Sequence, residues 1–197
     1  MKEEFEEIFH DEESNDLVNR YEEMLKSNRK YFFDVFEFES IIDYYIDTDK
    51  TNNALNVVKF ASQQHPNSVN LQLKEAQVLI DKGLAGQALK VIEHVEFIES
   101  SNSDVYLIKG SALNILGKHS DAERAFDHAI EFTYDDKVEV MHTIAQSFDQ
   151  IGRYKTALKY LLAAYDLENS NVAVLYDIGY CYEKLGQINR SIEYYNQ

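Results

Sequence analysis

Residues 175–186 read LYDIGYCYEKLG, and residues 106–117 carry a related pattern, YLIKGSALNILG. In both stretches apolar residues recur every three or four positions, and a glycine ends the stretch. Glycines recur in this way at 83, 117, 152 and 186, at intervals of 34, 35 and 34 residues, in a chain with only 7 glycines and one proline. Self-similarity at such a period is typical of stacked supersecondary units.

Small and large residues keep the same period as the glycines. A small residue lies seven positions before each glycine, at Ala76, Gly110, Ala145 and Gly179, and another lies five positions after it, at Ala88, Ala122, Ala157 and Ser191. A bulky residue follows nine positions after each glycine, at Ile92, Phe126, Leu161 and Tyr195. Small residues let two helices approach closely, and a large one fills the space beside them. One period upstream, Ala54 and Val58 continue the pattern, but Asp49 replaces the glycine.

The stretch between two glycines divides into two helical segments. Residues 138–151 and 154–165 both carry apolar side chains at helical intervals. Each unit is therefore expected to be a helix, a glycine turn and a second helix, with the glycine in the left-handed conformation that closes a helix. The polar runs 101–103 and 169–171 supply starts for the next helices, and Ser120 with Glu123 fits a capping box.

These motifs resemble the tetratricopeptide repeat (TPR) family, whose unit is a helix-turn-helix of 34 residues. The resemblance implies an all-α fold, a right-handed α-solenoid (superhelix) of TPR repeats with an extra amino-terminal helix. The repeats would span residues 35–68, 69–102, 103–137 and 138–171, with a partial repeat at 172–197. The first repeat, which lacks its glycine, is the most divergent.

Residues 1–34 are expected to be an acidic amino-terminal segment and a capping helix. Residues 1–13 hold one lysine and seven acidic residues, although Phe5, Ile8 and Phe9 lie at helical spacing. This part is either a solvated tail or an amphipathic helix docked on the first repeat. Residues 15–29 are expected to form a helix that covers the end of the stack, because terminal repeats need an atypical cap.

The overall charge restricts the class of partner. The chain has 19 Lys and Arg against 35 Asp and Glu, a formal net charge of −16. Nucleic acid is therefore not expected as a partner, since phosphate binding depends on basic side chains. No apolar run approaches the ~18 residues that cross a bilayer, so membrane insertion is not expected. The single cysteine and the lack of a secretion signal at residues 1–6 favour a cytoplasmic location.

No residue pattern indicates catalysis. The run Asp47-x-Asp49-x-Thr51-x-Asn53 imitates a calcium loop, but the glycine and the final glutamate of such a loop are absent, so an inter-helix turn is expected. The six histidines lack the spacing of a zinc-binding helix. Cys181 lies among apolar neighbours and is expected to be a buried structural thiol. The chain is therefore expected not to be an enzyme and to hold no metal or cofactor.

The resemblance implies that the first helices of the repeats line a concave groove, which holds a peptide or helix of another protein. The expected groove residues are Glu39, Asp43, Asp47, Asn70, Lys74, Gln77, Asp81, Asp104, Leu107, Ser111, Asn114, Glu139, His142, Gln146, Asp149, Gln150, Tyr176, Asp177 and Tyr180. This groove is polar to acidic, which favours a basic or neutral partner segment. The lysine and asparagine pair with which some family members clamp acidic carboxyl termini has no match here.

The resulting functional hypothesis is a non-catalytic scaffold for protein–protein interaction. Tyr176 and Tyr180, four residues apart on one helix, are expected to form an exposed aromatic pair that suits a partner. One alternative is a structural module that pairs with a second copy through its open carboxyl-terminal end, where Ile188, Ile192 and Tyr195 would expose apolar surface. Another is the regulatory or accessory amino-terminal part of a longer protein.

Overall fold

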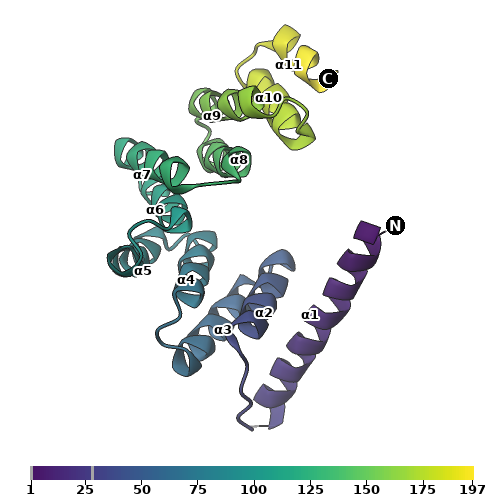
Figure 1. The fold of residues 1–197 in the computed structure, drawn as a ribbon, viewed down its shortest axis with the longest axis vertical. Coiled ribbons are helices and arrows are strands. Elements are labelled where there is room, and N and C mark those ends of the chain that lie inside the picture. The colour runs from purple at the N-terminus through teal and green to yellow at the C-terminus, as the bar shows by residue number, and fades with distance from the viewer. Residues whose placement is uncertain (1, 28) are drawn as a thin grey trace. The chain divides into compact units, whose positions relative to one another are not determined.

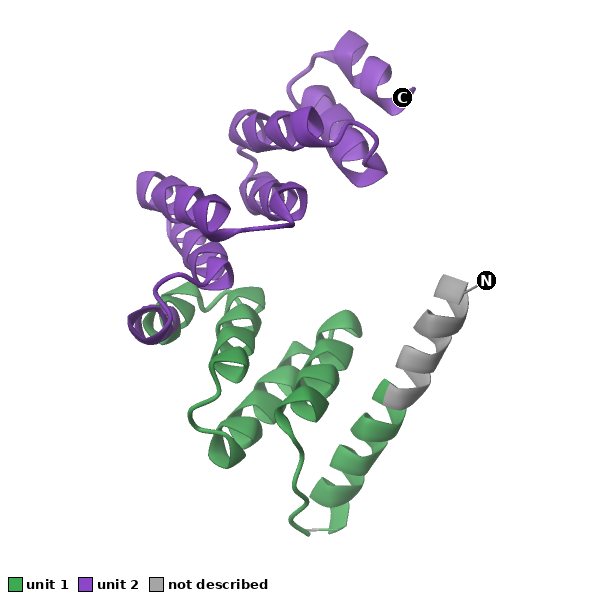
Figure 2. Ribbon diagram, in the orientation of Figure 1, with its two compact units in different colours: residues 1–91 green, residues 92–197 purple. Residues whose placement is uncertain are grey.

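The computed structural model describes the backbone of residues 2–27 and 29–197 and the side chains of residues 14–27 and 29–197. Every regular element in these ranges is an α-helix (Figure 1). The chain divides into two compact units, Met1–Val91 and Ile92–Gln197 (Figure 2). The expectation for Phe5, Ile8 and Phe9 lies outside the described side chains. No helix in the described part combines the length and apolarity needed to span a bilayer.

Unit 1 contains helices α1 to α4 and the beginning of α5, with bounds α1 Lys2–Ser27, α2 Val35–Asp47, α3 Thr51–Gln64, α4 Val69–Asp81 and α5 Ala85–Ile98. One continuous helix, α1, replaces the two separate segments expected before residue 30. It packs against α2 and buries Val18, Tyr21 and Met24 in a core that also holds Phe33 and Phe38. The carboxyl-terminal half of α1 therefore covers the first helical pair.

Unit 2 contains the remainder of α5 and three helical pairs. The bounds are α6 Ser103–Ile115, α7 His119–Phe132, α8 Lys137–Asp149, α9 Tyr154–Leu167, α10 Val172–Lys184 and α11 Ile188–Tyr195. Helix α6 packs against α7, α8 against α9 and α10 against α11. Successive pairs also touch, because α8 contacts α6 and α7, and α10 contacts α9. The expected all-α fold of stacked helical pairs is confirmed.

The periodic glycines adopt the left-handed conformation predicted for them. Their φ angles lie between +71° and +76°, a region that costs other L-residues roughly 1–2 kcal/mol. At Gly117, its own N–H donates to the Asn114 carbonyl at 3.0 Å, and the Lys118 N–H donates to the Leu113 carbonyl at 2.9 Å. This pair of bonds is the Schellman motif. Asp49 takes the same place in the first pair with φ +56°.

The helix starts follow a rule that the sequence revealed only in part. The first helices α2, α4, α6 and α10 begin after residues whose side chains accept a backbone hydrogen bond, Asp34, Ser68, Asn102 and Asn171, whereas Asp136 before α8 makes no such bond. Asp34 and Glu37 form a reciprocal capping box, with both bonds at 2.8 Å. The capping box predicted at Ser120 and Glu123 is wrong, because α7 already begins at His119 and its N-cap is Lys118.

Close helix contact at the small residues is confirmed. A methyl group added to Gly110 on α6 would collide with the Phe126 ring on α7. A methyl group added to Gly179 on α10 would lie 2.6 Å from the Tyr195 ring on α11. The large residue of the pattern therefore occupies the space left by the small residue of its partner helix.

Candidate partner-binding surface

In unit 1, the predicted groove residues lie on the first helices α2 and α4. Lys74 on α4 forms an ion pair with Asp43 on α2, with Nζ to oxygen distances of 2.5 and 2.8 Å. Gln77 donates to Asp81 at 3.1 Å, while Glu39 is half-buried and Asp47 and Asn70 are exposed. The one cation among these residues is thus already neutralised within the unit, and Glu39, Asp47 and Asp81 supply unbalanced negative charge.

Asn114 of unit 2 is part of the packing between helices. It is 1% exposed, and its amide donates to the carbonyl and the hydroxyl of Ser147 on α8 at 2.9 and 3.2 Å. Its side-chain oxygen lies 2.9 Å from the His119 Nδ1 on α7. These bonds join α6, α7 and α8, so Asn114 offers no free group to a partner.

His142 on α8 and Asp177 on α10 form a second link between neighbouring first helices. The imidazole Nε2 lies 2.7 Å from the Asp177 Oδ2, and His142 is only 9% exposed. The hydrogen bond to Asp177 raises the pKa of His142 above its ordinary value, although burial opposes the shift. The charges of Asp177 and Glu139 act in the same direction as the hydrogen bond.

Asp149, at the end of α8, is the acid of this region that is least satisfied. Its Oδ1 is buried and has no hydrogen-bond partner among the described residues. Burial raises the pKa of Asp149, and the charge of Asp177 adds to the shift while Lys184 opposes it. The same two carboxylates, after burial itself, raise the pKa of Cys181 to about 12, which fits the predicted inert thiol.

We define the first-helix surface of unit 2 as the predicted groove residues on α8 and α10 that reach solvent. It consists of Glu139, Gln146, Asp149, Gln150, Tyr176, Asp177 and Tyr180. It contains three carboxylates and no Lys or Arg. On α6, Asp104 is exposed and Leu107 and Ser111 are half-buried. Such a surface attracts cations and offers amides and ring faces for hydrogen bonding and packing.

Tyr176 and Tyr180, which were predicted to form one exposed pair, contact different aromatic rings in the structure. Tyr176 is 60% exposed, and its ring lies 5.5 Å from Tyr195 on α11. The Tyr180 ring instead lies 6.4 Å from Tyr154, with the Lys184 ammonium 4.8 Å from its centre. The two tyrosines therefore belong to different clusters.

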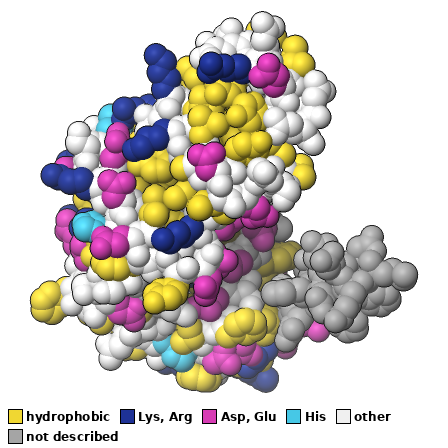
Figure 3. Space-filling view, turned by 45° about the horizontal axis from the view of Figure 1, so that its top comes forward, with side chains coloured by type: hydrophobic (Ala, Val, Ile, Leu, Met, Phe, Trp, Pro, Cys, Tyr) yellow, Lys and Arg dark blue, Asp and Glu magenta, His cyan; other side chains and the backbone are white. Residues whose placement is uncertain are grey.

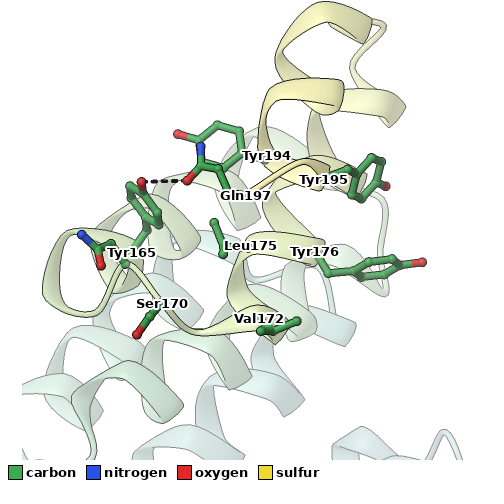
Figure 4. A pocket seen from close by; sticks show the side chains of 9 residues that line it. Tyr165, Ser170, Val172, Leu175, Tyr176, Tyr194, Tyr195 and Gln197 are labelled. Carbon is green, nitrogen blue, oxygen red and sulfur yellow. Dashed lines mark hydrogen bonds between the residues drawn. The ribbon is translucent and has the colours of Figure 1, made fainter.

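A hollow at the end of unit 2 was not foreseen. It has a volume of about 600 Å³ and is formed by the end of α9, the start of α10 and the end of α11. We call it the tyrosine hollow; it is lined mainly by Tyr165, Val172, Leu175, Tyr176, Tyr194 and Tyr195. Figure 4 shows Tyr165 to one side of Leu175 and Tyr176 and Tyr195 to the other. The Tyr165 hydroxyl donates a hydrogen bond to the side-chain oxygen of Gln197. In Figure 3, hydrophobic side chains also gather in the upper part of the view, which belongs to unit 2.

The helical pairs at the end of unit 2 match a family model described as tetratricopeptide repeat. The matched residues are 138–171 and 172–197, which contain α8 with α9 and α10 with α11. Residues 138–197 are therefore tetratricopeptide repeats. Earlier in the chain, Gly83 and Gly117 make the same left-handed turn as Gly152 and Gly186, and Gly110 packs on Phe126 as Gly179 packs on Tyr195. No curated protein matches it.

Several solved TPR-like structures share the fold. A thermophilic TPR protein of Thermus thermophilus, TTC0263, is 18% identical with a TM-score of 0.66, over 83% of this chain and 88% of that one. A crystal structure of MamA is 19% identical with a TM-score of 0.55, over 84% and 93%. MamA from Desulfovibrio magneticus RS-1 is 13% identical with a TM-score of 0.56, over 81% and 89%. At these identities the likeness concerns the fold alone.

Within the described residues, no three His, Cys, Asp or Glu side chains come together in a way that could hold an ion. The run from Asp47 to Asn53 spans the end of α2, the expected inter-helix turn at residues 48–50 and the start of α3. The useful groups of the surface are therefore carboxylates, amides and tyrosine rings.

Proposed function

We propose that this TPR protein is a non-catalytic scaffold whose first helices hold a basic or neutral segment of another protein. Residues 35–197 would form the repeats and residues 1–34 their amino-terminal cover. The single cysteine is buried and unpaired, so the chain needs no oxidising compartment, and we propose a cytoplasmic location. Each unit would present its own first-helix surface to the partner.

The observation that carries this proposal is that several acidic groove residues have no basic partner, whereas the groove lysine is already paired. Lys74, the only Lys or Arg among the predicted groove positions, is already paired with Asp43. Among the described residues, Glu39, Asp47, Glu139 and Asp149 form no ion pair. Carboxylates without cations favour a partner that supplies them, both by attraction and by speeding the encounter.

Calorimetric titration with synthetic twelve-residue peptides tests this proposal. A peptide rich in Lys and Arg is expected to bind, and its affinity to fall about tenfold when salt rises from about 50 to 300 mM, because exposed charges are screened. A peptide rich in Glu is expected not to bind. Tight binding of the acidic peptide, or salt-independent binding of the basic one, would contradict the proposal.

A matched pair of variants locates the binding. Neutralising Glu139→Gln together with Asp149→Asn should weaken the basic peptide several-fold, since both acids lie on the first-helix surface of unit 2. Glu131→Gln, which neutralises an exposed acid on the second helix α7, should leave the affinity unchanged.

A second candidate function is self-association through α11. Ile188 and Ile192 are each 52% exposed, whereas Leu158, at the position in α9 that corresponds to Ile192, is only 9% exposed because α10 covers it. A second copy could cover the bare face. Light scattering should then report a dimer that Ile192→Glu dissociates; a monomer at high concentration would exclude this candidate.

A further inference from the structure

The tyrosine hollow lacks the cation that other tyrosines of the same unit possess. Lys159 lies 4.8 Å from the centre of the Tyr160 ring, Lys184 lies 4.8 Å from Tyr180, and Arg190 lies 5.5 Å from Tyr182. In the described part of the chain, no Lys or Arg lies over Tyr165, Tyr176, Tyr194 or Tyr195, and none lines the hollow.

The surroundings of the hollow favour positive charge. The Tyr195 hydroxyl lies 3.4 Å from the Glu183 Oε2, which is exposed. Burial raises the pKa of Tyr194, the charge of Arg190 opposes this shift, and the charge of Asp166 adds to it more weakly. Arg190, however, is held over the Tyr182 ring and does not line the hollow. Negative groups beside open ring faces are complementary to a cation.

The shape and chemistry of the hollow favour arginine over lysine. Tyr176 and Tyr195 lie with their ring centres 5.5 Å apart and tilted by 45°, and their side chains are 60% and 42% exposed. A guanidinium is planar and stacks on aromatic rings, and its five N–H groups can reach amide and hydroxyl oxygens at the rim, such as those of Asn169 and Ser170. The apolar stem of an arginine can pack against Val172, which is 78% exposed.

We propose that the tyrosine hollow receives an arginine side chain of the partner segment, stacked on Tyr176 and Tyr195. This inference rests on the proposed scaffold function and names one anchor of the partner. The hollow adjoins the first-helix surface through Tyr176, which belongs to both. An arginine in the hollow would therefore fix the position of a segment whose remaining cations face Glu139 and Asp149.

Nuclear magnetic resonance of the whole labelled chain tests the anchor with a defined probe. The probe is a nonapeptide of Gly and Ser with one central arginine, and its control carries citrulline, which has the same shape without the charge. The arginine peptide should shift the ring signals of Tyr176 and Tyr195, and the citrulline peptide should bind at least about tenfold more weakly. Equal binding of the two peptides would overturn the inference.

Two substitutions of Tyr176 distinguish the contribution of its ring to binding from that of its hydroxyl. Tyr176→Phe keeps the ring and should keep most of the affinity, whereas Tyr176→Leu should lose about tenfold. Tyr176 is 60% exposed, so neither replacement should disturb the fold, and an amide spectrum that is unchanged away from residue 176 should verify this. Tyr134→Leu, which removes a 96% exposed tyrosine elsewhere in unit 2, should have no effect. An unchanged affinity of Tyr176→Leu would contradict the stacked arginine.

The same titration distinguishes the anchor from the scaffold proposal. Shifts confined to the amides of Gln146 and Asp149 would contradict the arginine anchor and leave the first-helix surface as the binding site. An absence of shifts on both surfaces, together with no binding of the longer basic peptide, would contradict both proposals.

Discussion

The imidazole of His142 on α8 is tied to the carboxylate of Asp177 on α10 by a hydrogen bond of 2.7 Å. Asp43 and Lys74 make the corresponding link between α2 and α4 in unit 1. Neighbouring first helices are thus joined by polar side chains on the same side that the sequence predicts to face a partner. Part of the polar character of this side therefore serves the repeat stack itself.

The histidine link should make stability depend on pH. The pKa of His142 is raised in the folded chain above the ordinary 6.5, so the link stabilises the fold below that pH and this contribution is lost as pH rises through the folded pKa. His142→Gln should lower the free energy of unfolding by about 1–2 kcal/mol near pH 5.5 and by clearly less near pH 8.5. Urea denaturation at both pH values measures this difference.

A histidine titration by nuclear magnetic resonance supplies the control. Asp177→Asn removes the negative charge and should bring the pKa of His142 down, because the charged partner causes the upward shift. A pKa that stays the same in this variant would refute the link.

Two glycines on first helices should differ in their tolerance of alanine. Gly110→Ala would press against Phe126, which is fully buried, and should cost about 1–3 kcal/mol even though alanine favours a helix. Gly179→Ala meets Tyr195, which is 42% exposed and can move, so its cost should be smaller. Urea midpoints of the two variants provide the comparison; equal midpoints would contradict the packing described.

Substitutions at the left-handed turn positions Gly117 and Asp49 should change stability in opposite directions. Gly117→Ala should destabilise by roughly 1–2 kcal/mol, because φ +76° is unfavourable for alanine. Asp49→Gly should be neutral or slightly stabilising, since glycine adopts φ +56° without a Cβ penalty. Thermal unfolding of both variants tests the turn geometry, and a stable Gly117→Ala protein would speak against it.

The buried alanines between paired helices should not accept larger side chains. Ala122 and Ala157 are both 0% exposed, so replacing either with leucine should cost about 1–3 kcal/mol through overpacking. Ala173→Leu, at an exposed position on α10, is the matched control and should have little effect. Denaturation midpoints that do not differ between buried and exposed sites would contradict close helix contact.

Features that depend on the repeat period were predictable from the sequence. The left-handed glycines, the small residue opposite the large one and the starts at Asn102 and Asn171 all recur at fixed places, so several copies report the same geometry. The start of α7 was missed because the Gly117 turn leads into the helix directly, without a capping side chain. Asp34 lies one period before the caps Ser68 and Asn102, but only at Asp34 does the third residue after the cap, Glu37, complete a capping box, so the repeat pattern did not reveal it.

The side-chain links of the site were not predictable in this way. Asp43 pairs with Lys74, Asn114 with Ser147 and His142 with Asp177, at separations of 31, 33 and 35 residues. These separations differ because the contacts depend on the lateral offset of neighbouring helices, which a repeat period of about 34 residues does not determine. The tyrosine hollow was missed for a related reason, since it joins α9, α10 and α11.

Selection of a random library of phage-displayed twelve-residue peptides on the intact chain tests the central claim most directly, because it leaves the partner's chemistry open. The account predicts that the enriched peptides carry a net charge of zero or above and lose binding when Glu139 and Asp149 are neutralised. Enrichment of acidic peptides, or of peptides whose binding survives that neutralisation, would contradict it.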